Sequence, residues 1–188
     1  MGSRLADALR ALDAGRLVVY PTDTLLGLAA RATDAEALER LAATKGRPRG
    51  QPVSVALSST EEIEPLALLT PTGRRFARTR LPGPFTLLAR RSRLAARTLA
   101  RGLAGPGGTV GFRVPDHPLA RELARRAGPI TATSANRHGE PPARTLASAR
   151  RMFGGEVAVY LAGGPRPSGR PSVLVDLTRD RFRVVARK

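Results

Sequence analysis

The sequence predicts a single α/β domain in which helices flank a twisted, mostly mixed or antiparallel open sheet. Three observations lead to this fold class. Short apolar stretches typical of strands alternate with stretches of helical periodicity. Several strands are joined by loops too short for a helical crossover, which favours antiparallel neighbours. The 188 residues contain no internal repeat, low-complexity segment or linker, so one domain spanning 1–188 is expected.

The first half of the chain contains the clearest periodic segments. Leucines recur at helical spacing from Leu5 to Leu12, and Gly15 ends this helix. Thr33 and Glu36 form a capping-box pattern that opens a second helix. The other elements expected here are strands at 17–20, 53–57 and 85–89, and short helices at 61–69 and 72–80. After a turn at 21–24, the stretch 25–30 continues apolar.

The second half is expected to complete the sheet. Asp116 is predicted to cap a helix whose inward residues include Leu119 and Leu123. The arginine-rich run from 90 to 101 is typical of a solvated face. The remaining expected elements are strands at 109–114, 157–161, 172–177 and 182–185, the last two as an antiparallel pair, and a helix at 145–153.

The chain is strongly basic. It carries 32 Lys and Arg against 15 Asp and Glu, for a formal net charge of +17. Such an excess favours polyanionic partners, namely nucleic acid, nucleotides or pyrophosphate. A compositional bias toward Ala and Arg is an equally good explanation. With two Tyr, five Phe and no Trp, a single-strand binder built on base stacking is disfavoured.

Composition also limits the other functional classes. Zero Cys excludes disulfides and thiolate metal sites, and two His disfavour a histidine-based site, so no resident metal is expected. No apolar run approaches the roughly 20 residues of a membrane span, and the N-terminus lacks a signal-peptide pattern. We therefore expect a cytoplasmic protein with no membrane partner. Glycine-rich dinucleotide, Walker-type and nucleophile-elbow motifs are all missing.

The stretch from Ile130 to Pro142 is the first candidate site, because a predicted strand there runs into a cluster of hydroxyl and amide side chains. Ser134 and Asn136 follow the strand, and ligands bind outside such strand ends in open α/β sheets. A simple polar turn is the alternative, since Ser, Asn and Gly are ordinary turn residues. Similar polar residues follow other strands, which favours a shared pocket.

Hydroxyls and cations recur at these loop tips. Lys45, Arg47 and Arg113 are able to neutralise carboxylate or phosphate oxygens. The alternatives are a turn hydroxyl for Thr24, a surface ion pair for Arg113 and a strand-edge position for Ser172. The full hydroxyl set is Thr22, Thr24, Thr109, Ser134 and Ser172. A cavity of this kind, without an obvious nucleophile, suits phosphoryl or nucleotidyl transfer, in which positioning and charge stabilisation dominate.

Lys45 is informative because the chain otherwise uses Arg. Apart from Lys188 it is the only Lys among 32 basic residues. A compact ammonium and a planar guanidinium are not interchangeable where geometry matters. The sequence therefore marks Lys45 as a position with a specific requirement.

Six collinear motifs resemble the YrdC-like family, the threonylcarbamoyl-AMP synthases, in its short single-domain form. They are Tyr-Pro-Thr-Asp-Thr-Leu-Leu-Gly-Leu, Lys-Gly-Arg-Pro, Leu-Pro-Gly-Pro-Phe-Thr, Val-Gly-Phe-Arg-Val-Pro-Asp-His-Pro, Thr-Ser-Ala-Asn-Arg-His-Gly-Glu-Pro-Pro and Pro-Ser-Val-Leu-Val-Asp-Leu-Thr. The resemblance covers essentially the whole chain. It implies a YrdC/RibB-like sheet with a large basic cleft.

The resemblance also implies a reaction. L-Threonine, bicarbonate and ATP would give threonylcarbamoyl-AMP and pyrophosphate, which makes the protein a nucleotidyltransferase. The product would serve t6A37 modification of tRNA, with tRNA or proteins of the t6A-transferase complex as partners. Mg²⁺ would arrive with ATP, because the sequence offers no carboxylate cluster to hold it. An RNA- or tRNA-binding factor without catalysis is the alternative, and a hydrogenase-maturation type of carbamoyl transferase is a second rival.

Site residues follow from the resemblance position by position. The threonine-binding set implied is Thr24, Arg113, Ala132 and Ser172, with Arg113 on the threonine carboxylate. The ATP-binding set implied is Lys45, Arg47, Thr109, Ser134, Asn136 and Arg187, with Lys45 and Arg47 as the catalytic pair on the phosphates. Three positions depart from the family pattern: Leu26 replaces a frequent Tyr, Ala56 a His of longer relatives, and Val173 a Thr.

Overall fold

The computed structural model describes residues 2–48 and 50–185. Within these residues ten strands form one sheet in the order β10-β9-β5-β6-β3-β7-β2-β1-β8, with β4 paired to β5. Antiparallel pairs predominate, and β1–β8, β3–β6 and β5–β9 are parallel. The predicted mixed sheet is therefore confirmed. Its strands are β1 (Val18–Tyr20), β2 (Gly27–Ala29), β3 (Ser54–Ala56), β4 (Ala67–Leu68), β5 (Phe85–Arg91), β6 (Thr109–Arg113), β7 (Ile130–Ser134), β8 (Val159–Tyr160), β9 (Val173–Asp176) and β10 (Arg183–Val185).

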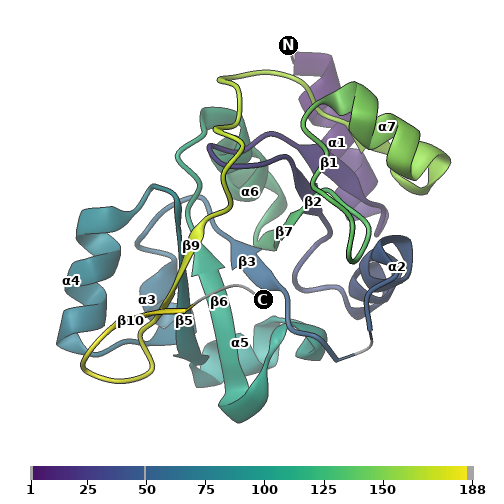
Figure 1. Cartoon of the computed structure of the whole chain (residues 1–188). Helices are drawn as coiled ribbons and strands as arrows, with labels where there is room; N and C mark the ends of the chain where they lie inside the picture. The colour runs from purple at the N-terminus through teal and green to yellow at the C-terminus, as the bar shows by residue number, and fades with distance from the viewer. Residues whose placement is uncertain (1, 49, 186–188) are drawn as a thin grey trace.

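Helices lie on both faces of this sheet (Figure 1). The α-helices are α1 (Gly2–Asp13), α2 (Ala35–Lys45), α3 (Ile63–Leu66), α4 (Pro71–Arg80), α5 (Arg93–Thr98), α6 (Pro118–Ala127) and α7 (Leu146–Phe153). Three short 3-10 turns are η1 (Arg101–Leu103), η2 (Pro106–Gly108) and η3 (Gly154–Glu156). None of the helices within 2–48 and 50–185 combines the length and apolar character that a membrane crossing requires.

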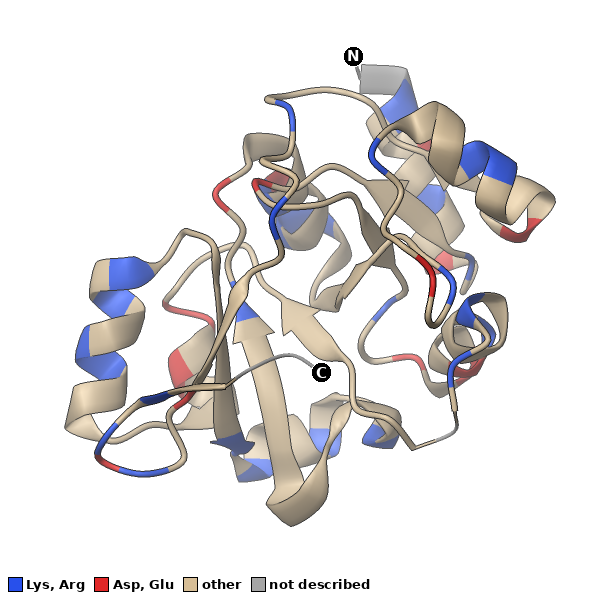
Figure 2. Ribbon diagram, viewed as in Figure 1, with Lys and Arg blue, Asp and Glu red and all other residues tan. Residues whose placement is uncertain are grey.

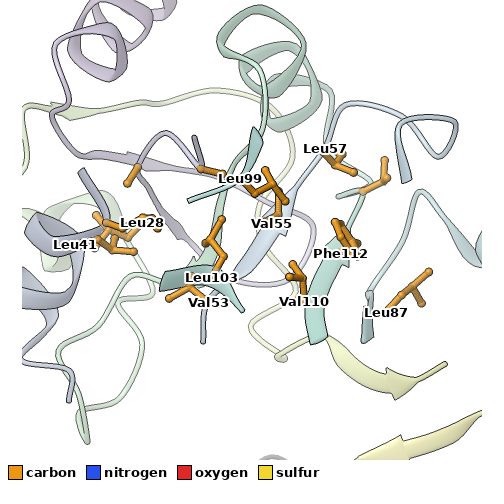
Figure 3. Packing of buried hydrophobic residues seen from close by; sticks show 14 of the residues in the cluster. Leu28, Leu41, Val53, Val55, Leu57, Leu87, Leu99, Leu103, Val110 and Phe112 are labelled. Carbon is orange, nitrogen blue, oxygen red and sulfur yellow. The ribbon is translucent and has the colours of Figure 1, made fainter. Parts of the chain in front are cut away.

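One face of the sheet is covered along most of its length. Leu28, Val55, Leu87 and Phe112 point to this side from four different strands, and all are fully buried (Figure 3). Buried residues of α2, α3, α4, α5 and α7 pack against them. Complete burial of large apolar side chains on this face supplies the main hydrophobic stabilisation of the fold.

The opposite face is covered only in part. The α1 and α6 helices lie together (Figure 1) and bury Tyr20, Ala29, Ala56 and Ile130 beneath them. Since side chains alternate along a strand, the same face continues beyond α6 with the side chains of β6, β3 and β7. There it carries small and polar residues, such as Ser54, Gly111 and Ala132, instead of large apolar ones.

Three local predictions were wrong. Asp34, not Thr33, caps α2, because its carboxylate accepts from the Ala37 N–H at 3.1 Å. His117, not Asp116, caps α6. The expected helix at 61–69 is only α3, since residues 67 and 68 pair with β5 as strand β4. The expected antiparallel pair at the C-terminal end is confirmed as β9 and β10.

Candidate functional site

A pocket lies on the partly uncovered face of the sheet. We call it the Arg113 pocket. It is lined by Tyr20, Thr22, Thr24, Leu25, Leu26, Gly27, Arg113, Pro115, Ala132, Thr133, Ser134, Pro171 and Ser172. All four residues of the predicted threonine-binding set are in this lining, although they come from four separate parts of the chain. Because the four residues line one pocket, the alternative that they occupy unrelated turn and strand-edge positions is not sufficient.

Strand register brings these residues together. Gly27 of β2 pairs with Ser134 of β7, and Ala132 of β7 pairs with Ser54 of β3. The β3–β6 pairing then places Ala56 beside Arg113. Each pairing is fixed by backbone hydrogen bonds, and a slip of one residue would turn the whole polar set to the other face. The sheet itself therefore positions this half of the site.

Small residues keep the floor of the site open. A Cβ on Gly111 would lie 2.3 Å from Oγ of Ser54, and a Cβ on Gly27 would lie 2.6 Å from the ring of Tyr20. Neither distance is compatible with a real side chain without displacement of its neighbours. The glycines of these two strands are thus required for close packing beside the pocket.

Arg113 is a buried cation paired with a buried carboxylate. Its Nη2 donates to Oδ1 of Asp23 at 2.5 Å, and the two side chains are only 9% and 14% exposed. The alternative of a surface ion pair is therefore wrong, because the pair is buried. Nε of Arg113 and Oδ2 of Asp23 are buried without hydrogen-bond partners in the protein. The guanidinium thus keeps donor capacity beyond the ion pair.

Asp23 was missed as a site residue by the sequence reasoning. The signal was present, since Asp23 is an acid inside the quoted motif from Tyr20 to Thr24 in a chain with few acids. Its backbone oxygen and that of Thr24 accept from Ser168 and Gly169. Asp23 therefore connects the first motif to Arg113 through an ion pair and to the loop that precedes β9 through a backbone hydrogen bond.

Hydroxyl groups form paired contacts around the pocket. Thr86 and Ser172 are both buried, and their Oγ atoms are 2.7 Å apart. Thr22 and Thr24 form a second pair, with a separation of 3.1 Å between their hydroxyl oxygens. Thr86 was not predicted, and its only sequence signal is its place in the Leu-Pro-Gly-Pro-Phe-Thr motif. These pairs hold the hydroxyls in place before a ligand arrives.

Lys45 is the last residue of α2, and its side chain reaches the end of β7 next to the pocket. Its Nζ donates to the carbonyl oxygens of Ser134 and Asn136, both at 2.6 Å, and to Oδ1 of Asn136 at 3.4 Å. Burial, with a smaller contribution from the nearby Arg47 cation, lowers the pKa of Lys45 to about 8. All three ammonium donors are engaged by protein oxygens, so a phosphate contact requires exchange of at least one of them.

Unlike the predicted threonine set, the remaining residues of the predicted ATP set do not line one pocket. Arg47 lines a different cavity, which lies between α2 and α5 and which we call the α2–α5 groove. Its Nη2 donates to the Pro52 carbonyl at 2.8 Å. Thr109 begins β6 and donates to the Pro106 carbonyl at 3.0 Å. Oγ of Ser134 donates to Oδ1 of Asn136 at 2.6 Å. Arg187 lies outside the described residues.

The departures from the family pattern fall at different depths. Leu26 lines the Arg113 pocket and also belongs to the core, so an aromatic wall is replaced there by an aliphatic one. Ala56 is buried under α6, beside Arg113. Val173 is 39% exposed at the start of β9 and is not part of the pocket lining. Leu26 is therefore the departure that alters the pocket surface.

Charge is distributed mainly away from the pocket. Lys and Arg lie along α4, α5 and α7 and in the turn between β9 and β10 (Figure 2). Arg113 is the one cation in the lining of the Arg113 pocket, whereas Arg47, Arg97 and Arg101 line the α2–α5 groove. No group of three or more His, Asp or Glu in residues 2–48 and 50–185 is arranged to hold a metal ion. The expectation that Mg²⁺ comes with ATP stays a prediction.

The fold and site define an α/β domain whose partly uncovered sheet face holds a pocket with a buried guanidinium and several hydroxyl groups. A family model for Sua5, YciO and YrdC proteins, described as "Telomere recombination", matches residues 10–188. The chain belongs to this Sua5/YciO/YrdC family.

Curated relatives match almost the whole chain. A Mycobacterium tuberculosis protein is 41% identical over 175 residues, which are 93% of this chain and 79% of the relative. The threonylcarbamoyl-AMP synthase of Chromohalobacter salexigens is 39% identical over 176 residues, which are 93% of this chain and 92% of the relative.

Solved structures share the fold. Sua5 of Pyrococcus abyssi, in a complex with L-threonine, superposes with a TM-score of 0.86 at 32% identity over 96% of this chain. The match covers 52% of the Sua5 chain, so this chain spans about half of that protein. YciO of E. coli gives a TM-score of 0.85 at 23% identity, covering 96% of this chain and 87% of its own, which shows the fold alone.

Proposed function

We propose that the protein is a threonylcarbamoyl-AMP synthase, an enzyme that forms L-threonylcarbamoyladenylate and pyrophosphate from L-threonine, bicarbonate and ATP. One observation carries the proposal: the four residues predicted to bind threonine, from four parts of the chain, line one pocket. Family membership and relatives that bear this enzyme's name support it. They also disfavour the alternative of an RNA-binding factor without catalysis.

The pocket chemistry fits a small amino acid. The guanidinium of Arg113 would bind the α-carboxylate, and Asp23 would hold that guanidinium in place from behind. Arg is suited to carboxylates because its planar fork donates two parallel hydrogen bonds. Thr24 and the Thr86–Ser172 hydroxyl pair would contact the amine and the β-hydroxyl group, with Ala132 against the aliphatic part.

Two balanced steps describe the reaction. The threonine amine and bicarbonate condense to a carbamate and release water. An oxygen of the carbamate then attacks the α-phosphorus of ATP, the bond to the β-phosphate oxygen breaks, and pyrophosphate leaves. No covalent enzyme intermediate is needed, so the protein acts by positioning and by charge stabilisation. This chemistry makes the protein a nucleotidyltransferase.

Cations next to the pocket would hold the nucleotide. Lys45 and Arg47 would bind the phosphates, and Ser134, whose carbonyl accepts from Lys45, also lines the Arg113 pocket. Thr109 and Asn136 complete the proposed ATP set, together with Arg187. Mg²⁺ bound to the ATP phosphates would neutralise part of the charge that develops on pyrophosphate. Because Lys45 and Arg47 both engage backbone oxygens, ATP binding would require the loop that follows α2 to rearrange.

The product class links the protein to tRNA. A threonylcarbamoyl adenylate is an activated carbamoyl donor, and t6A modification of tRNA is the use that the sequence predicts for it. Exposed arginines on the outer helices would suit contact with tRNA or with proteins of the t6A-transferase complex. A cytoplasmic location agrees with these partners and remains a prediction.

Pyrophosphate release tests the proposed function. We expect release from ATP only when L-threonine and bicarbonate are both present, and no release with other amino acids that lack a β-hydroxyl group. Arg113→Met serves as the inactive control, because it removes the proposed carboxylate ligand. Release that does not depend on threonine would contradict the proposal.

A further inference from the structure

The last turn of α2 is fastened to the loop that follows β7. An α-helix leaves its final carbonyl groups without partners inside the helix. In α2 the Thr44 carbonyl accepts from Nη1 of Arg137 at 2.7 Å, and the Lys45 carbonyl accepts from the backbone N–H of His138 at 2.6 Å. A cation at this end of a helix also interacts favourably with the helix dipole. Residues 137 and 138 therefore cap the helix end that carries Lys45.

Lys45 donates in the opposite direction. Its Nζ bonds to the carbonyl oxygens of Ser134 and Asn136, which lie at the end of β7 and in the loop after it. Hydrogen bonds thus run both ways between residues 44–45 and 134–138. The position of the Lys45 ammonium is set by the helix end as well as by its own bonds.

Arg137 extends this connection to α7. Its Nη2 donates to the Met152 carbonyl at 3.1 Å and to Oε1 of Glu156 at 2.5 Å, and its guanidinium carbon lies 5.7 Å from the centre of the Phe153 ring. The loop after β7 lies between α7 and α2 (Figure 1). One planar guanidinium therefore ties α2 to α7, which the compact ammonium of a Lys is less able to do.

The two cations of the predicted ATP set are held by different segments. Gly46 ends α2 with a φ of +62°, and Arg47 beyond it donates to the Pro52 carbonyl of its own loop. Lys45 is held instead by the loop after β7 and, through Arg137, by α7. A rearrangement of the loop after α2 is therefore compatible with a fixed position of Lys45.

We propose that Arg137 is a positioning residue, which holds the last turn of α2 so that the Lys45 ammonium stays at the end of β7 to meet the ATP phosphates. The inference rests on the proposed function, and it adds a residue outside both predicted binding sets. Three N–H groups of Arg137 are engaged by protein oxygens. Arg137 acts through Lys45 and does not itself bind the nucleotide.

A double-mutant cycle on the intact chain tests this role. Calorimetry with ATP and excess Mg²⁺, and separately with L-threonine, compares the original chain with Arg137→Met, Lys45→Met and the double variant. We expect each single substitution to weaken ATP binding about tenfold or more, as for the loss of one charge-assisted hydrogen bond. In the Lys45→Met background Arg137→Met should add less than about twofold, because the residue through which it acts is gone. L-Threonine affinity should stay within about twofold in Arg137→Met, since strand pairing holds the Arg113 pocket.

A matched variant controls for the loss of charge. Arg150 is also an arginine of this region, on α7, and its guanidinium carbon lies 4.5 Å from the centre of the Tyr160 ring. Arg150→Met removes the same charge and should leave ATP affinity within about twofold. If Arg137→Met does not fold, Arg137→Lys keeps the charge without the planar fork and should weaken ATP binding about threefold.

Four results would overturn the inference. Additive losses in the double variant would mean that Arg137 reaches the nucleotide by its own charge. Equal losses of ATP and L-threonine affinity would mean that Arg137 serves only the fold. A loss in Arg150→Met as large as that in Arg137→Met would assign the effect to net charge. Unchanged ATP affinity in a folded Arg137 variant would leave it no role at the site.

The outcome is distinguishable from failure of the proposed function. If the original chain binds no ATP, the proposed function fails and the inference fails with it. If the original chain releases pyrophosphate in a threonine- and bicarbonate-dependent way but the losses from Arg137→Met and Lys45→Met are additive, only the inference is overturned.

Discussion

The two halves of the candidate site differ in how they are held. The Arg113 pocket draws Thr24, Arg113, Ala132 and Ser172 together through strand pairings that fix their register. The predicted nucleotide half depends on Lys45, the last residue of α2, and on Arg47 in the loop that follows. Both side chains donate to backbone oxygens, and Arg47 faces another cavity. If the proposed roles hold, the difference predicts a preorganised amino-acid pocket beside a nucleotide site that forms when its ligand arrives.

Removal of Arg113 should produce the largest effect, because it affects the preorganised half. Arg113→Met leaves Asp23 as an unpaired buried carboxylate, which costs about 3 kcal/mol of stability. Loss of a buried charge pair with the substrate carboxylate costs about 2–5 kcal/mol, so kcat/KM for threonine should fall by roughly 30-fold or more. Steady-state kinetics and thermal unfolding measure the two effects.

A second substitution separates the two effects of Arg113→Met. Addition of Asp23→Asn removes the unpaired charge, so we expect stability to recover while threonine turnover stays low. Recovery of turnover in the double variant would show that Arg113 serves the fold and not the substrate.

Substitution of Gly111 tests whether register and close packing hold the preorganised half. The new Cβ of Gly111→Ala would lie 2.3 Å from Oγ of Ser54. Overpacking of this kind typically costs 1–3 kcal/mol, measurable by denaturant unfolding. Ser54→Ala removes the nearest atom and should restore part of the loss in the double variant. An unchanged midpoint for Gly111→Ala would mean that the sheet floor is more adaptable than its geometry indicates.

A pH titration of ATP binding addresses the other half of the site. Burial lowers the pKa of Lys45 to about 8, so its ammonium is charged below that pH and loses its proton as the pH rises through it. ATP affinity should therefore be full near pH 7 and fall by several-fold toward pH 9. Lys45→Arg keeps its charge throughout this range and should show a flat profile. The same pH dependence in Lys45→Arg would remove Lys45 as its source.

Arg47 should give the smallest effect. It faces the α2–α5 groove, and its nucleotide contact would form only after the loop moves. We expect Arg47→Ala to weaken ATP binding by roughly threefold to tenfold, with a shallower dependence on salt because one cation is lost. An effect as large as that of Arg113→Met would show that the loop already holds Arg47 at the nucleotide.

Local sequence patterns predicted most elements but not all of their ends. Periodicity identified the helices that became α2 and α6, yet both caps were misplaced by one residue, because neighbouring polar residues are all acceptable N-caps. The helix expected at 61–69 was shortened by pairing with β5, a partner more than twenty residues away along the chain. Tertiary contacts of this kind override local propensity.

The candidate site was predicted to a similar extent. Motifs with hydroxyls and cations after strands identified Thr24, Arg113 and Ser172 correctly as pocket residues. They did not identify Asp23 or Thr86. Nothing in the local sequence shows that Asp23 pairs with Arg113 or that Thr86 contacts Ser172. The ligand roles of all these residues stay predictions.

By itself the sequence determined the fold class, the alternation of strands and helices, and which loop tips carry chemistry, because these depend on local periodicity and residue type. Only the tertiary structure decided that Asp23 pairs with Arg113, that the Lys45 ammonium donates to the carbonyl oxygens of Ser134 and Asn136, and that the Thr22 hydroxyl donates to the Leu25 carbonyl. Such features depend on the distances between particular atoms. Those distances are set by strand register and packing across the whole domain, which no local pattern contains.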